Sequence, residues 1–124
     1  MINYRGVSHR LTTGVPFTSL EYESFKQPLL HLIKRNAGRE VFLLGVSLGG
    51  NMAANLVADP ELDNGSIKAA VLSQPALDLV KVQAQMEKSL FGFYSKRFGS
   101  GFKDYMQMSG SVDILRQEFK AKDS

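Results

Sequence analysis

Cysteine is absent from this chain of 124 residues, and only two histidines are present, His9 and His31. Without cysteine the protein can form no disulfide, no thiolate zinc site and no cysteine nucleophile. The small number of histidines also restricts metal binding and general-base chemistry. We therefore expect neither a metal nor a cofactor.

Runs of one charge and long apolar stretches are also missing. The 15 basic residues stand against 12 acidic ones, and no basic run is longer than two, so nothing indicates a nucleic-acid partner. No stretch approaches the roughly 20 apolar residues of a membrane span, and the first ten residues lack the apolar core of a signal peptide. We expect a location in the cytoplasm or at the periphery of a membrane.

A helix is predicted up to Arg35. Its apolar residues recur at near-helical intervals: Leu20, Phe25, Leu29, Leu32 and Ile33. Thr18 and Glu21 have the spacing of a capping box at its start. Pro28 predicts a kink or a fresh start near Gln27, because proline lacks the amide proton and clashes with the preceding turn.

Two short apolar runs, residues 41–46 and 67–72, predict strands. The first run shows no alternation, which indicates a strand covered on both faces, as in parallel sheets flanked by helices. Residues 48–58 between the two runs favour a helix that stops at Asp59-Pro60. A strand, a helix and a strand in this order predict a parallel crossover and an α/β fold. Residues 2–6 read like the end of another strand running into a glycine turn.

The most informative segment is Gly45-Val46-Ser47-Leu48-Gly49. Between a buried strand and a helix, Gly-x-Ser-x-Gly is typical of a nucleophile elbow, in which a strained turn lifts the serine hydroxyl above the sheet edge. Glycines at both ends are needed where the chain reverses against itself. The Leu48 amide, at the helix start, would supply half of an oxyanion hole.

A glycine-rich phosphate loop is the main alternative, since the same strand-to-helix geometry binds anions. The segment lacks the lysine of a P-loop and the glycine spacing of a dinucleotide site, and the elbow is therefore favoured. An anion-binding module would respond to phosphate or nucleotide with a higher melting temperature.

Three segments together carry a resemblance to a known family: residues 3–6 (Asn-Tyr-Arg-Gly), residues 44–51 (Leu-Gly-Val-Ser-Leu-Gly-Gly-Asn) and residues 69–79. They resemble the YheT-like esterase and lipase branch of the α/β-hydrolase superfamily, over nearly the whole chain to about Lys103. The resemblance implies that Ser47 is the acyl-forming serine and that residues 80–108 are cap helices over an acyl pocket. It also implies a substrate among short- to medium-chain esters, acylglycerols or phospholipids. We divide the chain accordingly into a partial hydrolase core, 1–79, and a helical cap with a charged tail, 80–124.

The resemblance further implies that parts of the site belong to segments outside this sequence. In the superfamily one oxyanion amide precedes the segment that resembles residues 2–6, and the catalytic acid and histidine follow the cap. Within the chain, His9 leaves the expected sheet edge and is the better candidate base, whereas His31 suits a surface or packing role. Asp78 follows the second strand and is either the acid or a cap of the next helix.

An aromatic and methionine-rich series runs from Met86 to Met106, broken at Gly99-Ser100-Gly101 and interleaved with lysine and arginine. It is either core packing and the wall of an acyl pocket, or a surface that docks on a membrane or a protein. Two functions follow for the whole chain. One is part of a serine carboxylic-ester hydrolase; the other is an inactive remnant that acts as an interaction protein, with a partner completing its sheet.

Overall fold

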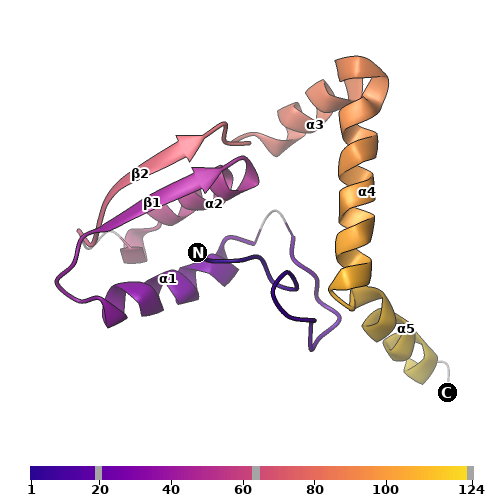
Figure 1. The fold of residues 1–124 in the computed structure, drawn as a ribbon, viewed down its shortest axis with the longest axis horizontal. Helices are drawn as coiled ribbons and strands as arrows, with labels where there is room; N and C mark the ends of the chain where they lie inside the picture. Colours follow the sequence, from indigo (N-terminus) through magenta and orange to yellow (C-terminus); the bar gives the residue numbers. More distant parts are fainter. Residues whose placement is uncertain (19–20, 63–64, 123–124) are drawn as a thin grey trace. The chain divides into compact units, whose positions relative to one another are not determined.

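A computed structural model describes residues 1–18, 21–62 and 65–122, with the side chains of Leu90 and Phe91 outside that description. The chain forms two compact units. The strand unit contains Ile2 and residues 19–79, and the helical unit contains Met1, residues 3–18 and residues 80–124. Each unit is described by itself below (Figure 1).

The strand unit has an α/β arrangement. Its described elements are α1 (Glu23–Arg35), β1 (Val41–Val46), α2 (Leu48–Val57), the 3-10 turn η1 (Pro60–Leu62) and β2 (Ile67–Ser73). The two strands pair in parallel, with Leu44 opposite Val71 and Val46 opposite Ser73, and α2 forms the connection between them (Figure 1). The predicted parallel strand, helix and strand are therefore confirmed.

Helix α2 packs on one face of this two-stranded sheet and also contacts α1. Its short side chains let it lie close to the strands, and the core of the unit is built around it. The buried apolar residues are Phe25, Leu29, Met52, Ala53, Leu56 and Leu62. Burial of a large aliphatic or aromatic side chain contributes about 2 kcal/mol, so this small cluster is the main stabilising contact of the unit.

The opposite face of the sheet is exposed in the described residues. Phe42, Leu44 and Val71 are 65%, 73% and 62% exposed. They share a face because side chains alternate along a strand and paired residues of parallel strands point the same way. The prediction that residues 41–46 are covered on both faces is thus wrong for the described residues. An apolar run shows which side chains a strand has, but it does not show which elements pack on its two faces.

A buried ion pair joins α1 to the segment that follows α2. The Lys26 Nζ lies 2.7 Å from the Asp59 Oδ2 and 3.0 Å from the Glu61 Oε2. The side chains of Lys26 and Asp59 are only 7% and 4% exposed, whereas that of Glu61 is 71% exposed. The hydrogen bond from Lys26 lowers the pKa of Asp59, and the same bond raises the pKa of Lys26. Asp59 also accepts a hydrogen bond from the Glu61 amide and so caps η1.

The helical unit consists of α3 (Leu79–Lys88), the 3-10 turn η2 (Ser89–Gly92), α4 (Phe93–Met108) and α5 (Ser111–Lys122), together with the loop 3–18. The first residue of α3, Leu79, still belongs to the strand unit. Gly92 and Gly110, with φ of 77° and 80°, provide the left-handed residues at the start of α4 and between α4 and α5. Glycine adopts this conformation without steric cost.

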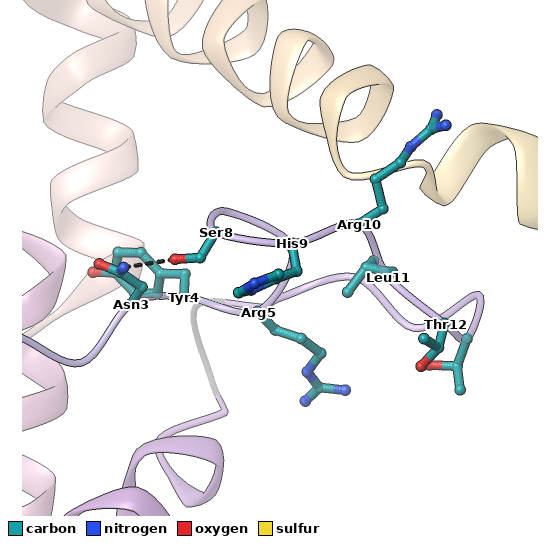
Figure 2. Close-up of a pocket in the computed structure, with 10 residues that line it drawn as sticks. Asn3, Tyr4, Arg5, Ser8, His9, Arg10, Leu11 and Thr12 are labelled. Atoms are coloured by element: carbon teal, nitrogen blue, oxygen red, sulfur yellow. Dashed lines mark hydrogen bonds between the residues drawn. The ribbon is translucent and has the colours of Figure 1, made fainter.

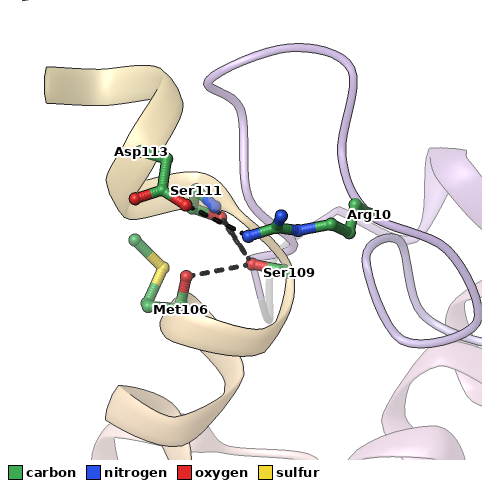
Figure 3. A network of polar contacts seen from close by, with 5 residues as sticks. All are labelled: Arg10, Met106, Ser109, Ser111 and Asp113. Carbon is green, nitrogen blue, oxygen red and sulfur yellow. Dashed lines mark hydrogen bonds and ion pairs between the residues drawn. The ribbon is translucent and has the colours of Figure 1, made fainter. Parts of the chain in front are cut away.

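The loop 3–18 is held to the end of α4 by polar contacts. The Tyr105 hydroxyl donates to the Arg5 carbonyl at 2.7 Å and accepts from the Phe17 amide at 2.8 Å. At the corner between α4 and α5, the buried Ser109 and Ser111 hydroxyls share a hydrogen bond, and Arg10 pairs with Asp113 at 3.0 Å (Figure 3). One tyrosine therefore joins two points of the loop that are twelve residues apart in sequence.

Several local predictions differ from the structure. No strand forms at residues 1–4, because no described strand lies beside them to share hydrogen bonds. Helix α1 starts at Glu23 after Tyr22, without a side-chain cap, so the Thr18 and Glu21 capping box is wrong. Leu20 lies outside the described residues. The helix also continues through Pro28, since the loss of one hydrogen bond is outweighed by the burial of Phe25 and Leu29.

The predicted break at Gly99-Ser100-Gly101 is wrong as well, because α4 runs through it. A glycine in a helix costs about 1 kcal/mol, which weakens the helix but does not end it. The break lies instead at Gly92, where the left-handed φ interrupts the helical path. The division into 1–79 and 80–124 concerns function and stays a prediction.

Candidate active site

Ser47 lies at the turn between β1 and α2. Its backbone angles, φ 52° and ψ −119°, are in a region that residues other than glycine rarely occupy. Its side chain is exposed at the carboxyl end of the strand. This is the conformation of a nucleophile elbow, as the Gly-x-Ser-x-Gly segment predicts.

The turn requires glycine at a position where the backbone crosses itself. A Cβ on Gly45 would lie 2.4 Å from the Gly49 carbonyl oxygen and 2.7 Å from the Gly50 Cα, and backbone atoms cannot move aside as a side chain can. This close approach of two backbone segments explains why residue 45 is a glycine. Gly49 is the residue whose backbone lies against it.

Gly50 has a structural role that the sequence analysis did not assign. A Cβ at Gly50 would lie 2.9 Å from the Pro75 Cβ, so Gly50 lets the segment after β2 approach the start of α2. The doubled glycine after the serine was the available signal, because the elbow pattern itself needs only the first of the two.

The Ser47 backbone is hydrogen-bonded on both sides. Its amide donates to the Ser73 carbonyl at 2.9 Å, which extends the β1–β2 pairing by one residue. Its carbonyl accepts from the amides of Gly50 at 2.9 Å, Asn51 at 3.3 Å and Ala76 at 3.4 Å. The turn is thus tied both to its own helix and to the neighbouring strand end.

Leu48, the predicted oxyanion donor, is the first residue of α2. The amide of the first helical residue has no acceptor within the helix, and the helix dipole places partial positive charge there. The position therefore suits the stabilisation of an oxyanion on a group bound to Ser47. Leu48 directly follows Ser47 in the chain, and its role as oxyanion donor stays a prediction.

Asn51 is a second residue that the sequence analysis did not single out, although it belongs to the quoted motif. Its side-chain amide donates to the Ala76 carbonyl at 2.8 Å, and its own Oδ1 accepts from Asn55 at 3.1 Å. Asn51 is 9% exposed. It connects the first turn of α2 to the segment that follows β2.

The candidate base and acid are placed as follows. His9 lies in the loop of the helical unit, whereas Ser47 belongs to the strand unit, so their pairing stays a prediction. His31 is exposed on α1, which agrees with a surface role. Asp78 is exposed in the strand unit directly before α3, a position that suits both the acid and the cap of that helix.

His9 lines a hollow of about 330 Å³ formed by residues 3–13. Asn3 and Ser8 close one end of it through a side-chain hydrogen bond of 2.7 Å (Figure 2). Arg5 and Arg10 extend from the loop in opposite directions, and Arg10 reaches Asp113 (Figure 2). The two guanidinium groups therefore do not converge on one ligand.

Within residues 1–18, 21–62 and 65–122, no three acidic or histidine side chains are grouped so that they could hold a metal ion. In the same part of the chain, the helices fall short of the length and apolar character that crossing a membrane requires.

A parallel strand, helix and strand with a strained serine at the first turn define an α/β-hydrolase type of protein. The model of the family described as serine aminopeptidase, S33, matches residues 6–112, and the chain belongs to this family of the α/β-hydrolase superfamily. No curated protein and no solved structure matches the chain. The match covers both the elbow and α4.

Proposed function

We propose that this chain carries the nucleophile of a serine carboxylic-ester hydrolase, with Ser47 as the attacking residue. The observation that carries the proposal is the backbone of Ser47, which is strained, exposed and hydrogen-bonded to the adjacent strand end. Strain of this kind persists only where the surrounding structure enforces it, and it concentrates at functional sites.

In the proposed reaction the Ser47 hydroxyl attacks the ester carbonyl, and the Leu48 amide stabilises the oxyanion. The alcohol leaves with the proton that a base removed from Ser47, and water then releases the carboxylic acid. His9 is the candidate base and Asp78 the candidate acid within this sequence. Both assignments are hypotheses, because a serine without a base is an ordinary alcohol.

An ester is preferred as substrate because the Ser-Leu-Gly-Gly-Asn segment resembles the esterase and lipase branch of the superfamily. Membership of the family described as serine aminopeptidase, S33, favours a second candidate, hydrolysis of an amide at the amino end of a peptide. Both reactions use the same elbow and differ in the leaving group. The elbow geometry therefore supports both candidates equally, and the substrate must be tested directly.

Labelling with a fluorophosphonate probe tests the nucleophile. We expect the chain to be labelled, and we expect Ser47→Ala to abolish the label while Ser73→Ala retains it, since Ser73 is exposed on the adjacent strand end but not in an elbow. An unlabelled chain, or equal labelling of both variants, contradicts the proposal. Hydrolysis of 4-nitrophenyl butyrate compared with leucine 4-nitroanilide then separates the ester from the peptide candidate.

The exposed sheet face favours an alternative from a different class. Phe42, Leu44 and Val71 form an apolar surface of the type that marks interaction sites, which suits an inactive hydrolase remnant whose sheet a protein partner completes. A folded chain that is not labelled and that associates in solution would support this alternative.

The aromatic residues of α4 are consistent with contact to lipid or acyl chains. Phe93, Phe98 and Phe102 are exposed in the helical unit. The two hypotheses for these side chains are the wall of an acyl pocket and docking on a membrane surface. Binding of the chain to anionic vesicles, compared with Phe98→Ser, would distinguish the membrane surface from the pocket.

A further inference from the structure

Ser47 shares its positive φ with one other non-glycine residue of the described chain. Among the described residues other than glycine, positive φ occurs at Ser47, with 52°, and at Gln74, with 48°. Both residues directly follow the carboxyl ends of the paired strands, because Val46 lies opposite Ser73. The two strained residues therefore occupy neighbouring positions at one edge of the sheet.

The segment after Gln74 is held against the elbow by three contacts. The Asn51 side chain donates to the Ala76 carbonyl at 2.8 Å, and the Ala76 amide donates to the Ser47 carbonyl at 3.4 Å. Pro75 lies so close to Gly50 that a Cβ there would approach it to 2.9 Å. Because these contacts fix Pro75 and Ala76, they also hold the backbone of Gln74, which directly precedes them.

The side chain of Gln74 is exposed, so its own burial does not account for the strained conformation. Glycine would adopt the same φ without the clash of a Cβ. A residue with a long polar side chain lowers stability when its backbone has this φ. The backbone of Gln74 keeps this φ because of the contacts of the next two residues. Such outliers indicate a functional constraint.

We propose that Gln74 is a substrate-contacting residue of the Ser47 site and that Asn51 positions it. This inference rests on the proposed function. A carboxamide has two N–H donors, whereas an ester offers only acceptor oxygens, so the side-chain amide of Gln74 donates a hydrogen bond to the bound acyl ester. Asn51 acts through the segment 74–76 and does not touch the substrate.

Gln74→Gly separates this role from a structural one, because its two effects have opposite signs. We expect the melting temperature to rise, since the strain is relieved, and the rate of acylation by 4-nitrophenyl butyrate to fall about 5- to 10-fold, the equivalent of one neutral hydrogen bond. Gln74→Glu, which removes both N–H donors at nearly the same shape, should lower the acylation rate at least as much. Gln27→Ala, at an exposed glutamine of α1, is the matched control and should leave the rate unchanged.

A Gln74→Gly chain that acylates as fast as the unmodified chain would overturn the proposal. A second experiment does not depend on the nucleophile. N-butylbutyramide, an amide analogue of the ester, is titrated into Ser47→Ala while the side-chain amide signals are followed by NMR, with the Gln74 signal assigned from its loss in Gln74→Glu. We expect that signal to shift saturably.

No binding, or saturation without movement of the Gln74 signal, would also overturn the inference. Failure of fluorophosphonate labelling would instead remove the proposed nucleophile while leaving the Gln74 shift intact, so the two failures are distinguishable. Asn51→Asp replaces the donating amide by an acceptor and should abolish the Gln74 shift in a chain that remains folded. An unchanged shift in that variant would exclude Asn51 as the positioning residue.

Discussion

The contacts within the strand unit differ in kind from those within the helical unit. At the Ser47 turn of the strand unit, backbone lies on backbone, with room for a hydrogen but not for a carbon at Gly45. In the helical unit, side chains reach across to a loop, as Tyr105 does to Arg5 and Phe17. The first arrangement fails when atoms are added, and the second fails when a polar group is removed. Five substitutions test this difference.

The largest effect is expected from Gly45→Ala. The added Cβ would meet the Gly49 carbonyl at 2.4 Å, and separating β1 from α2 should lower the free energy of unfolding by about 3 kcal/mol. Urea denaturation measures the loss, and amide exchange in residues 41–46 locates it. Gly38→Ala is no suitable control, because Gly38 has φ of 82°, so Gly99→Ala, described below, serves instead. An unchanged free energy would contradict the crossing seen at this turn.

Lys26→Met tests the one buried ion pair described above. It leaves Asp59 buried without its partner, so we expect a larger fall in melting temperature than for Glu61→Gln, whose side chain is mostly exposed. Equal falls in melting temperature for the two substitutions would show that the buried pair contributes no more to stability than the exposed contact.

The same pair predicts a pH dependence. The pKa of Asp59 is lowered in the folded chain, so its contribution is present above the ordinary value near 3.8 and is lost as the pH falls through the folded value. The stabilisation that goes with the raised pKa of Lys26 is fully present below its ordinary value of 10.5 and declines only above it, so it adds no pH dependence in acid. The melting temperature should therefore fall less steeply in acid for Asp59→Asn than for the unmodified chain. Parallel acid profiles would refute this assignment.

Tyr105→Phe removes the hydroxyl that bridges the loop of the helical unit. Two hydrogen bonds are lost at a half-buried position, and we expect about 1 to 2 kcal/mol of destabilisation with faster amide exchange in residues 3–18. Tyr94→Phe, on an exposed part of the same helix, is the matched control. Equal exchange in both variants would mean that the bridge does not hold the loop.

The smallest effect, of opposite sign, is expected at Gly99 in α4. Nothing lies within 4 Å of a Cβ added there, and alanine favours a helix over glycine by about 1 kcal/mol. Gly99→Ala should therefore stabilise the chain slightly, as measured by urea denaturation. A loss of stability would indicate an unrecognised neighbour of Gly99.

Much of the strand unit could be predicted because its signals are local. Strand β1 coincides with the apolar run 41–46, and α2 ends at Val57, close to the predicted stop at Asp59-Pro60. The elbow at Ser47 was predictable because its residue types follow from the backbone reversal itself. The helical unit was harder, since Gly99 and Gly101 resemble a break but only weaken a helix that other contacts maintain.

Contacts between distant residues could not be predicted in the same way. Nothing in the local sequence shows that Lys26 pairs with Asp59, or that Asn51 reaches Ala76. The roles of Gly50 and Gln74 could not be predicted, because they depend on the segment after β2 lying against the start of α2. His9 and Asp78 remain predictions for the same reason, because a catalytic role depends on distance to Ser47 and not on residue type.

The sequence by itself determined the α/β order of elements, the position of the elbow and the absence of cysteine chemistry, since these follow from residue type and short-range spacing. The tertiary structure decided which face of the sheet is covered, which ion pair is buried and that Gln74 stands beside Ser47 in a strained conformation. The physical reason is that a chain reversal is encoded in a few adjacent residues, whereas burial and hydrogen-bond partners are properties of segments that meet only after folding.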